Sequence, residues 1–250
     1  WETSMVKTLS FSGAIVLLLS LTGCAALSGQ NTSSDGSGVR PVGGNANNVI
    51  ARAQDPSPEE NRAVHRDLVR KMLDQGQYYA ALAHVEELKR ANGDTLEVRY
   101  LEAEAKRNLN RTSEAMKLYN SLLNTQFDGE AHHGLGLLTF GMDRVGAVQH
   151  LRMAVQRQPT DSQFRNDLGF ALMQSGRYAE ALPELATAVE LDSSNLKARN
   201  NLVVMLIASG NATRARQVAR DSGMNDQAYA AAQKSAESFA QSMAQSGQKR

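Results

Sequence analysis

Five alanines recur along this chain at a nearly constant interval. The residues Ala81, Ala115, Ala147, Ala181 and Ala215 lie 34, 32, 34 and 34 residues apart. A glycine stands five residues before three of these alanines, where a turn between two helices is expected. A fixed period of this length is the signature of a repeat protein, whose units stack because none can bury its apolar face alone. The period therefore predicts an all-α solenoid.

The clearest unit runs from Asp167 to Asp192, DLGFALMQSGRYAEALPELATAVELD. Apolar residues at helical spacing fill both halves of this unit, and Ser175 and Gly176 separate the halves. Small residues, among them Gly169 and Ala181, stand where two helices would cross closely. The unit is therefore expected to form two helices joined by a tight turn.

The unit resembles the tetratricopeptide repeat (TPR), whose 34 residues carry Leu-Gly on the first helix, Tyr and Ala on the second, and Pro at the exit. The matching residues are Leu168, Gly169, Tyr178, Ala181 and Ala188 in the fourth unit, Leu135, Gly136, Ala147, Ala154 and Pro159 in the third, and Gly76, Tyr78 and Ala81 in the first. The resemblance implies a right-handed superhelical solenoid of helix-turn-helix repeats with a C-terminal capping helix.

The period divides a domain expected at 59–245 into about five repeats. These are residues 62–95, 96–129, 130–161, 162–195 and 196–229. Ser57 is expected to cap the first helix. The third repeat is two residues short, and we place the deletion in or near its first helix, around Gly134–Gly141, where glycines would relax the geometry. An apolar stripe predicts a capping helix at 226–245, and 246–250 are expected to form a disordered tail.

Residues 1–23 have the layout of a secretory signal peptide. Trp1 to Ser4 precede a methionine and are expected to lie before the natural start at Met5. Lys7 then precedes an apolar run of about 13 residues, which is too short to span a bilayer of ~30 Å. The run ends in Leu21-Thr22-Gly23-Cys24, which resembles a bacterial lipobox, in which the cysteine thiol is acylated.

Cys24 is the only cysteine of the chain and cannot form an internal disulfide. The alternative to a covalent lipid is a free thiol, and the apolar run before Cys24 favours the lipid. Residues 24–58 are rich in Gly, Ser, Asn and Pro and are expected to form a flexible, lipidated tether. Since no aspartate follows Cys24, the lipoprotein resemblance implies attachment to the outer membrane, with the domain facing the periplasm.

Charge and motifs argue against most other classes of function. The formal net charge of +1 does not favour nucleic acid as a partner. The sequence has no phosphate-binding glycine loop, no GxSxG and no HExxH or CxxC motif. His132 and His133 are adjacent, so on a helix they point about 100° apart and are expected to be solvated or groove-lining rather than metal ligands. We expect no enzyme activity, no metal, no cofactor other than the lipid and no small-molecule substrate.

In TPR proteins the first helices of successive repeats line a groove that binds protein partners. The resemblance carries this role to Tyr100, Arg107, Asn166, Phe170, Met173, Lys197, Asn200, Asn201, Val204 and Ile207. An asparagine amide both donates and accepts hydrogen bonds, so it can bind the backbone of an extended peptide. A second interpretation stands beside this one: the asparagines solvate an exposed helix face or bond to the next repeat.

Lipobox, tether and repeats together resemble the pilotin-like TPR lipoproteins of bacterial pilus and secretion systems. Within these, LGFALMQSGRYAEAL (168–182) and LKARNNLVVMLIASGNATRA (196–215) are most similar to the TadD family of Tad (Flp) pilus assembly. The resemblance implies binding and localisation of an outer-membrane secretin, without catalysis. Two alternatives remain, a pilotin of a type IV pilus or type II secretion system and a scaffold for cell-envelope enzymes or outer-membrane assembly.

Replacement of Cys24 tests the anchor. In a Cys24→Ser variant the thiol that would be acylated is gone, so we expect the protein to lose radiolabelled palmitate and to leave the outer-membrane fraction. Ala25→Ser, the neighbouring small residue, serves as the control and should retain the label. A membrane fraction unchanged by Cys24→Ser would contradict the lipid anchor.

Overall fold

The computed structural model describes residues 57–247, and every regular element in that range is an α-helix. The predicted signal peptide, Cys24 and nearly all of the predicted tether lie outside the described residues. The helices are α1 (Pro58–Asp74), α2 (Tyr78–Asn92), α3 (Leu96–Asn108), α4 (Thr112–Leu122), α5 (Asp128–Thr139), α6 (Arg144–Arg157), α7 (Ser162–Gln174), α8 (Tyr178–Leu191), α9 (Leu196–Ala208), α10 (Ala212–Asp221) and α11 (Asp226–Gly247).

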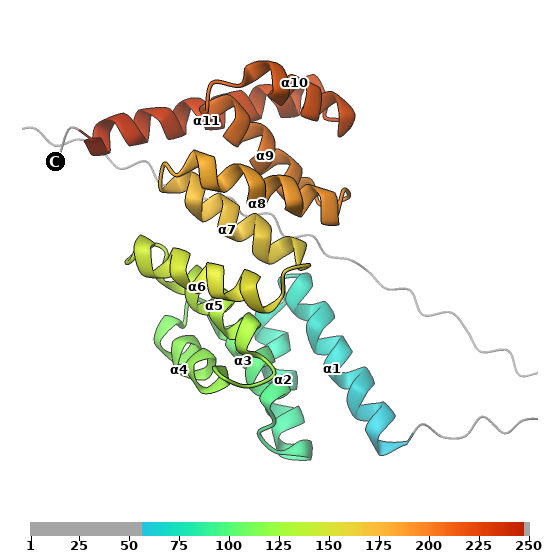
Figure 1. The fold of residues 1–250 in the computed structure, drawn as a ribbon. Coiled ribbons are helices and arrows are strands. Elements are labelled where there is room, and N and C mark those ends of the chain that lie inside the picture. The colour runs from blue at the N-terminus through green and yellow to red at the C-terminus, as the bar shows by residue number, and fades with distance from the viewer. Residues whose placement is uncertain (1–56, 248–250) are drawn as a thin grey trace, which may run out of the picture. The chain divides into compact units, whose positions relative to one another are not determined.

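The first ten helices form five consecutive pairs, which follow one another in sequence order along the stack (Figure 1). The second helix of each of the first four pairs also packs on the first helix of the next pair. This arrangement is a solenoid of helix pairs, and it confirms the all-α prediction. None of the helices in the described part of the chain has both the length and the apolar character needed to cross a membrane.

Local sequence signals set the helix ends. Ser57 caps α1 as predicted, because its hydroxyl accepts from the backbone N–H of Glu60 and the Glu60 carboxylate accepts from the N–H of Ser57. Gly76, Gly176 and Gly210 follow the first helices of their pairs with φ between 72° and 81°. Glycine adopts this left-handed conformation without steric cost, so the chain can turn at once into the second helix.

The short interval in the repeat lies in a different place from the predicted one. In each of the second to fifth pairs the second helix begins 16 residues after the first, so the third pair itself is complete. The deletion falls earlier, because α4 has only 11 residues and ends at Leu122. The Thr125 hydroxyl donates to the Leu122 carbonyl, and Asn124 adopts φ 59°, so the chain turns early into α5. The predicted location of the deletion around Gly134–Gly141 is therefore wrong, since the deletion lies before α5.

The sequence predicts that the glycines of α5 relax the helix. In the structure they allow close packing instead. A Cβ atom on Gly134 would lie 2.2 Å from Cζ of Tyr119, and one on Gly136 would lie 2.7 Å from Cγ of Leu151. Gly169 of α7 has the same role, since its Cβ would lie 2.6 Å from Cγ of Leu185. Each glycine thus makes room for a large buried side chain of a neighbouring second helix.

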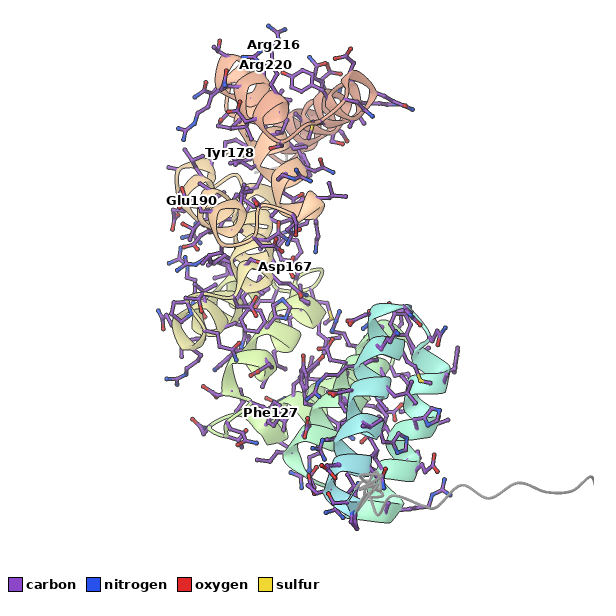
Figure 2. The ribbon with its side chains drawn as sticks, turned by 90° about the vertical axis from the view of Figure 1, so that its right-hand side faces the viewer. Phe127, Asp167, Tyr178, Glu190, Arg216 and Arg220 are labelled. Carbon is purple, nitrogen blue, oxygen red and sulfur yellow. The ribbon has the colours of Figure 1, made fainter. Side chains whose placement is uncertain are left out.

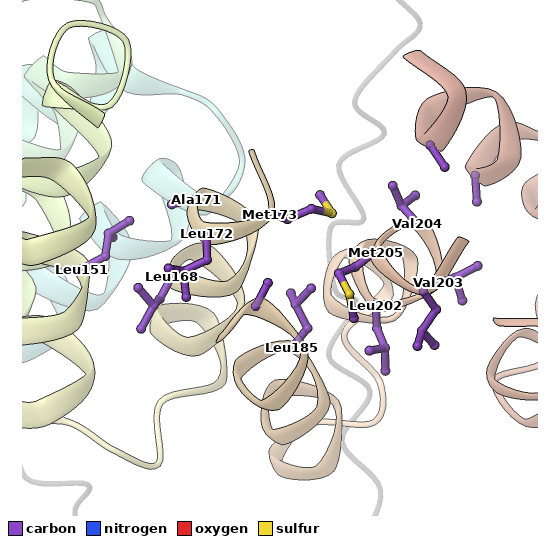
Figure 3. Close-up of a cluster of buried hydrophobic side chains, with 14 of the residues drawn as sticks. Leu151, Leu168, Ala171, Leu172, Met173, Leu185, Leu202, Val203, Val204 and Met205 are labelled. Atoms are coloured by element: carbon purple, nitrogen blue, oxygen red, sulfur yellow. The ribbon is translucent and has the colours of Figure 1, made fainter. Parts of the chain in front are cut away.

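The apolar core consists of three clusters that follow one another along the stack. The first joins α1, α2 and α3, the second joins α3, α4 and α5, and the largest extends from α6 to α11 (Figure 3). All five of the regularly spaced alanines are fully buried. Ala232 and Ala236 of α11 belong to the largest cluster, so the final helix covers the end of the core, as predicted for a capping helix.

Substitution of Gly134 tests the close approach of α4 and α5. We expect Gly134→Ala to lower the free energy of unfolding by about 1–3 kcal/mol, because the new methyl group overlaps the buried Tyr119 ring. Gly141→Ala is the matched control, since a Cβ there would have no neighbour within 4 Å. Urea unfolding followed by circular dichroism measures both variants. Equal stability of the two would contradict the packing role of Gly134.

Candidate protein-binding groove

A groove with a volume of about 750 Å³ opens between α7, α9 and α11. It is lined by Phe170 of α7, by Asn200, Asn201 and Val204 of α9, and by one side of α11 between Ala228 and Phe239. The first helices of repeats four and five thus form two of its walls. The third wall is α11, which packs on α9.

The floor of the groove is apolar and its edges are polar. Phe170 and Phe239 meet edge to face with their ring centroids 6.4 Å apart, and Val204 is buried next to them in the largest core cluster. The exposed side chains of Asn200 and Lys234 lie at the edges. A site of this kind can bury an apolar side chain and offer hydrogen bonds to the backbone that carries it.

A polar network centred on the buried Asn166 and Asp167 joins the first helices of three successive pairs and reaches the groove at Asn201. The Asp167 carboxylate bonds to His133 Nε2 of α5 at 2.9 Å and accepts from Lys197 Nζ of α9 at 2.8 Å. Asn166 Nδ2 donates to Asp167 Oδ1, and Asn166 Oδ1 accepts from Asn201 Nδ2 at 2.8 Å. Figure 2 shows Asp167 where α7 faces the preceding pair. The network therefore connects α5, α7 and α9 through side chains alone.

The network keeps Asp167 ionised. Burial of the carboxyl would raise its pKa, but the hydrogen bonds and charges of His133 and Lys197 outweigh burial and hold the pKa below its usual value. Asp167 therefore contributes stability above the unfolded-state pKa, and this contribution is lost as the pH falls through the lower, folded-state pKa.

The structure divides the site residues that the sequence predicted for repeats four and five. Phe170, Asn200, Asn201 and Val204 line the groove. The prediction is wrong for two others: Asn166 is 1% exposed and bonds to the next repeat, and Met173 is buried in the core, because the following pair covers both side chains. Ile207 packs half-buried against the same core, and Lys197 is exposed but pairs with Asp167.

The two predicted site residues of repeat two do not line this groove. Tyr100 stacks on Phe127, with ring centroids 5.4 Å apart, and burial raises the pKa of its hydroxyl. Arg107 pairs with Glu104 at 2.6 Å and donates to the Tyr119 hydroxyl at 3.2 Å. Both side chains therefore have partners within the second core cluster and its margin, where they hold α3 against α4 and α5.

The α11 wall was not among the predicted site residues. Its members Ala228, Ala231, Lys234, Ser235 and Ser238 flank the apolar stripe that predicted the capping helix. The apolar stripe predicts that α11 packs on the preceding repeat. It does not predict that the residues beside the stripe lie across the groove from Asn200. Groups able to hold a metal ion are found elsewhere, on α1 and α2.

Comparison with known proteins supports the repeat assignment. A family model described as tetratricopeptide repeat matches residues 172–238. A TPR repeat-containing protein of Pseudomonas aeruginosa is 37% identical over 154 residues, and the match spans 60% of this chain and 60% of the length of that relative.

Solved structures of other proteins share the fold. A thermophilic TPR protein of Thermus thermophilus, TTC0263, superposes with a TM-score of 0.55 at 18% identity over 70% of this chain and 98% of that one. MamA from residue 41 to its end, from Desulfovibrio magneticus RS-1, gives a TM-score of 0.50 at 19% identity over 65% of this chain and 93% of that one. At these identities the likeness concerns the fold.

An Asp167→Asn substitution tests the polar network. We expect it to lower the free energy of unfolding at pH 7 by about 1.5–3 kcal/mol, because it weakens hydrogen bonds made by a buried charge. Asp67→Asn, at an exposed carboxylate paired with Arg70, should cost less than about 1 kcal/mol. The deficit of Asp167→Asn should shrink below about pH 4 as the wild-type carboxylate is protonated. Urea titrations at several pH values measure both effects, and a deficit that grows in acid would contradict the assignment.

Proposed function

We propose that this tetratricopeptide-repeat solenoid is a non-enzymatic interaction module that binds a peptide segment of a partner protein between α7, α9 and α11. The observation that carries the proposal is the groove itself, in which an apolar floor and exposed amides lie side by side. A groove between helices is also where proteins of this architecture have room for a ligand.

The chemistry of the groove defines the segment it would take. Phe170, Val204 and Phe239 form a floor suited to an apolar or aromatic side chain. Among the side chains described between residues 57 and 241, the amide of Asn200 has no hydrogen-bond partner, so it is available to a peptide backbone. Lys234 at the edge favours a partner that carries a carboxylate near its apolar anchor.

For the cellular role, we propose that the protein is a lipoprotein of Tad (Flp) pilus assembly, of the TadD type, that binds an outer-membrane secretin and localises it. The lipobox at Cys24, the Gly- and Ser-rich tether and the similarity of residues 168–182 and 196–215 to that family support this role. In this proposal the lipid holds the protein on the periplasmic face of the outer membrane, and the tether lets the groove reach a partner away from the bilayer surface.

A pair of arginine substitutions on α11 tests the groove. Ser235 lines it, whereas Gln233, exposed on the same helix, does not. We expect Ser235→Arg to fill the groove and to reduce recovery of the secretin at least about tenfold, with helicity unchanged. Gln233→Arg should recover the secretin as the wild type does. The measurement is affinity purification from membranes followed by mass spectrometry, with circular dichroism as the test of folding.

Other results would redirect the proposal in defined ways. Equal recovery of the secretin with both arginine variants would exclude this groove as its binding site. Recovery of a peptidoglycan hydrolase in place of a secretin would contradict the pilus role and support a scaffold for cell-envelope enzymes. Recovery of a secretin from a type II secretion or type IV pilus system would keep the pilotin role and replace the Tad assignment. Deletion of the gene should also abolish surface pili.

A further inference from the structure

Two histidines and a glutamate of the first helix pair bring their ligand atoms together. His65 lies on α1, and His84 and Glu87 lie one turn apart on α2, so both α2 side chains face the same way. His65 Nε2 is 3.0 Å from His84 Nδ1. Glu87 Oε2 is 3.9 Å from His65 Nε2 and 3.5 Å from His84 Nδ1. The three atoms form a small triangle between the two helices.

The size of this triangle matches one face of a zinc coordination tetrahedron. Zinc binds imidazole nitrogen and carboxylate oxygen at about 2.0–2.2 Å, so neighbouring ligand atoms in a tetrahedral site stand about 3.3–3.5 Å apart. Of the three observed separations, 3.0 Å lies below this range, 3.5 Å lies at its upper end and 3.9 Å lies above it. The two distances outside this range differ from it by about 0.3–0.4 Å, so binding requires only small shifts of the ligand atoms.

We propose that His65, His84 and Glu87 bind Zn²⁺ and that the ion clamps α1 to α2, with a water molecule as the fourth ligand. Two nitrogens and one oxygen suit zinc better than Mg²⁺ or Ca²⁺, which prefer oxygen ligands. The side chains are 24%, 34% and 65% exposed, so an ion has a path from solvent and the fourth position is open to water.

Zinc binding has a simple proton balance. The two facing nitrogens share one hydrogen bond, so one of the two rings carries its proton on the facing nitrogen. When zinc binds, that proton moves to the other nitrogen of the same ring, and both lone pairs then point at the ion. Two neutral rings therefore release no proton, and the Glu87 carboxylate offsets one of the two charges of the ion.

A second histidine pair provides an internal comparison. His132 Nδ1 lies 2.9 Å from His150 Nδ1, a separation similar to that in the first pair. The nearest carboxylate, that of Asp128, approaches the opposite nitrogen of His132, Nε2, at 3.9 Å. Its oxygens also accept from the Asn124 N–H and from Arg157. The second pair therefore lacks a converging third ligand, and we expect it not to bind zinc.

The experiment is a calorimetric titration of the full-length protein with ZnCl₂ at pH 7.5. All variants carry Cys24→Ser, so that no free thiol competes for zinc, and are purified without a histidine tag. We expect one bound ion per chain and a higher midpoint of thermal unfolding in the presence of zinc. Loss of an outer-shell partner typically costs 10–100-fold in metal affinity, so loss of a direct ligand in His84→Gln or Glu87→Gln should cost at least about 100-fold.

His132→Gln is the matched control and should keep both the affinity and the thermal shift. Circular dichroism without metal shows whether each variant is folded. The proposal is overturned if the parent protein binds no zinc, or if His84→Gln and Glu87→Gln bind it as the parent does. It is also overturned if His132→Gln removes binding. The outcome is independent of the groove, since Ser235→Arg should leave zinc binding unchanged.

Discussion

The fold depends on helices that approach one another more closely than ordinary side chains allow. At Gly134, Gly136 and Gly169 the first helix of a pair has no Cβ, and the ring of Tyr119 or the side chain of Leu151 or Leu185 occupies the space. The fully buried alanines serve the second helices in the same way. Because these contacts recur at a fixed period, each pair is set on the preceding one in a similar manner. The first helices consequently share one side of the stack, where the groove lies.

Polar side chains add a second level of organisation to this apolar stack. The network around Asp167 connects α5, α7 and α9, and its bonds run between pairs rather than within one. Hydrogen bonds are directional, so a buried network of this kind fixes the relative position of neighbouring repeats more narrowly than apolar contact does. Asn201 belongs both to the network and to the groove wall. The shape of the proposed binding site therefore depends on the alignment of three repeats.

The helix pairs, the buried alanines, the cap at Ser57 and the final covering helix could all be predicted from the amino-acid sequence. These features follow from local rules: apolar period, small residues and capping chemistry act within one or two turns of a helix. The position of the deletion near repeat three was mispredicted because the regularly spaced alanines lie only on the second helices. The spacing between Ala115 and Ala147 therefore does not show which segment between them is shorter. Asn166 and Met173 were predicted to bind a partner because the position of a residue within the repeat indicates the direction of its side chain. That position does not show which other side chains cover it.

The contacts that each of those side chains makes depend on how the neighbouring helices pack. The neighbouring pair covers Asn166 and Met173, and α11 supplies the wall opposite Asn200. The three ligand atoms of His65, His84 and Glu87 converge because α1 and α2 cross at one particular level. Such contacts join residues far apart in the chain, and they depend on the angles between packed helices. Those angles result from the whole set of buried contacts. The repeat period identifies the helices that pack together but does not specify the angles between them.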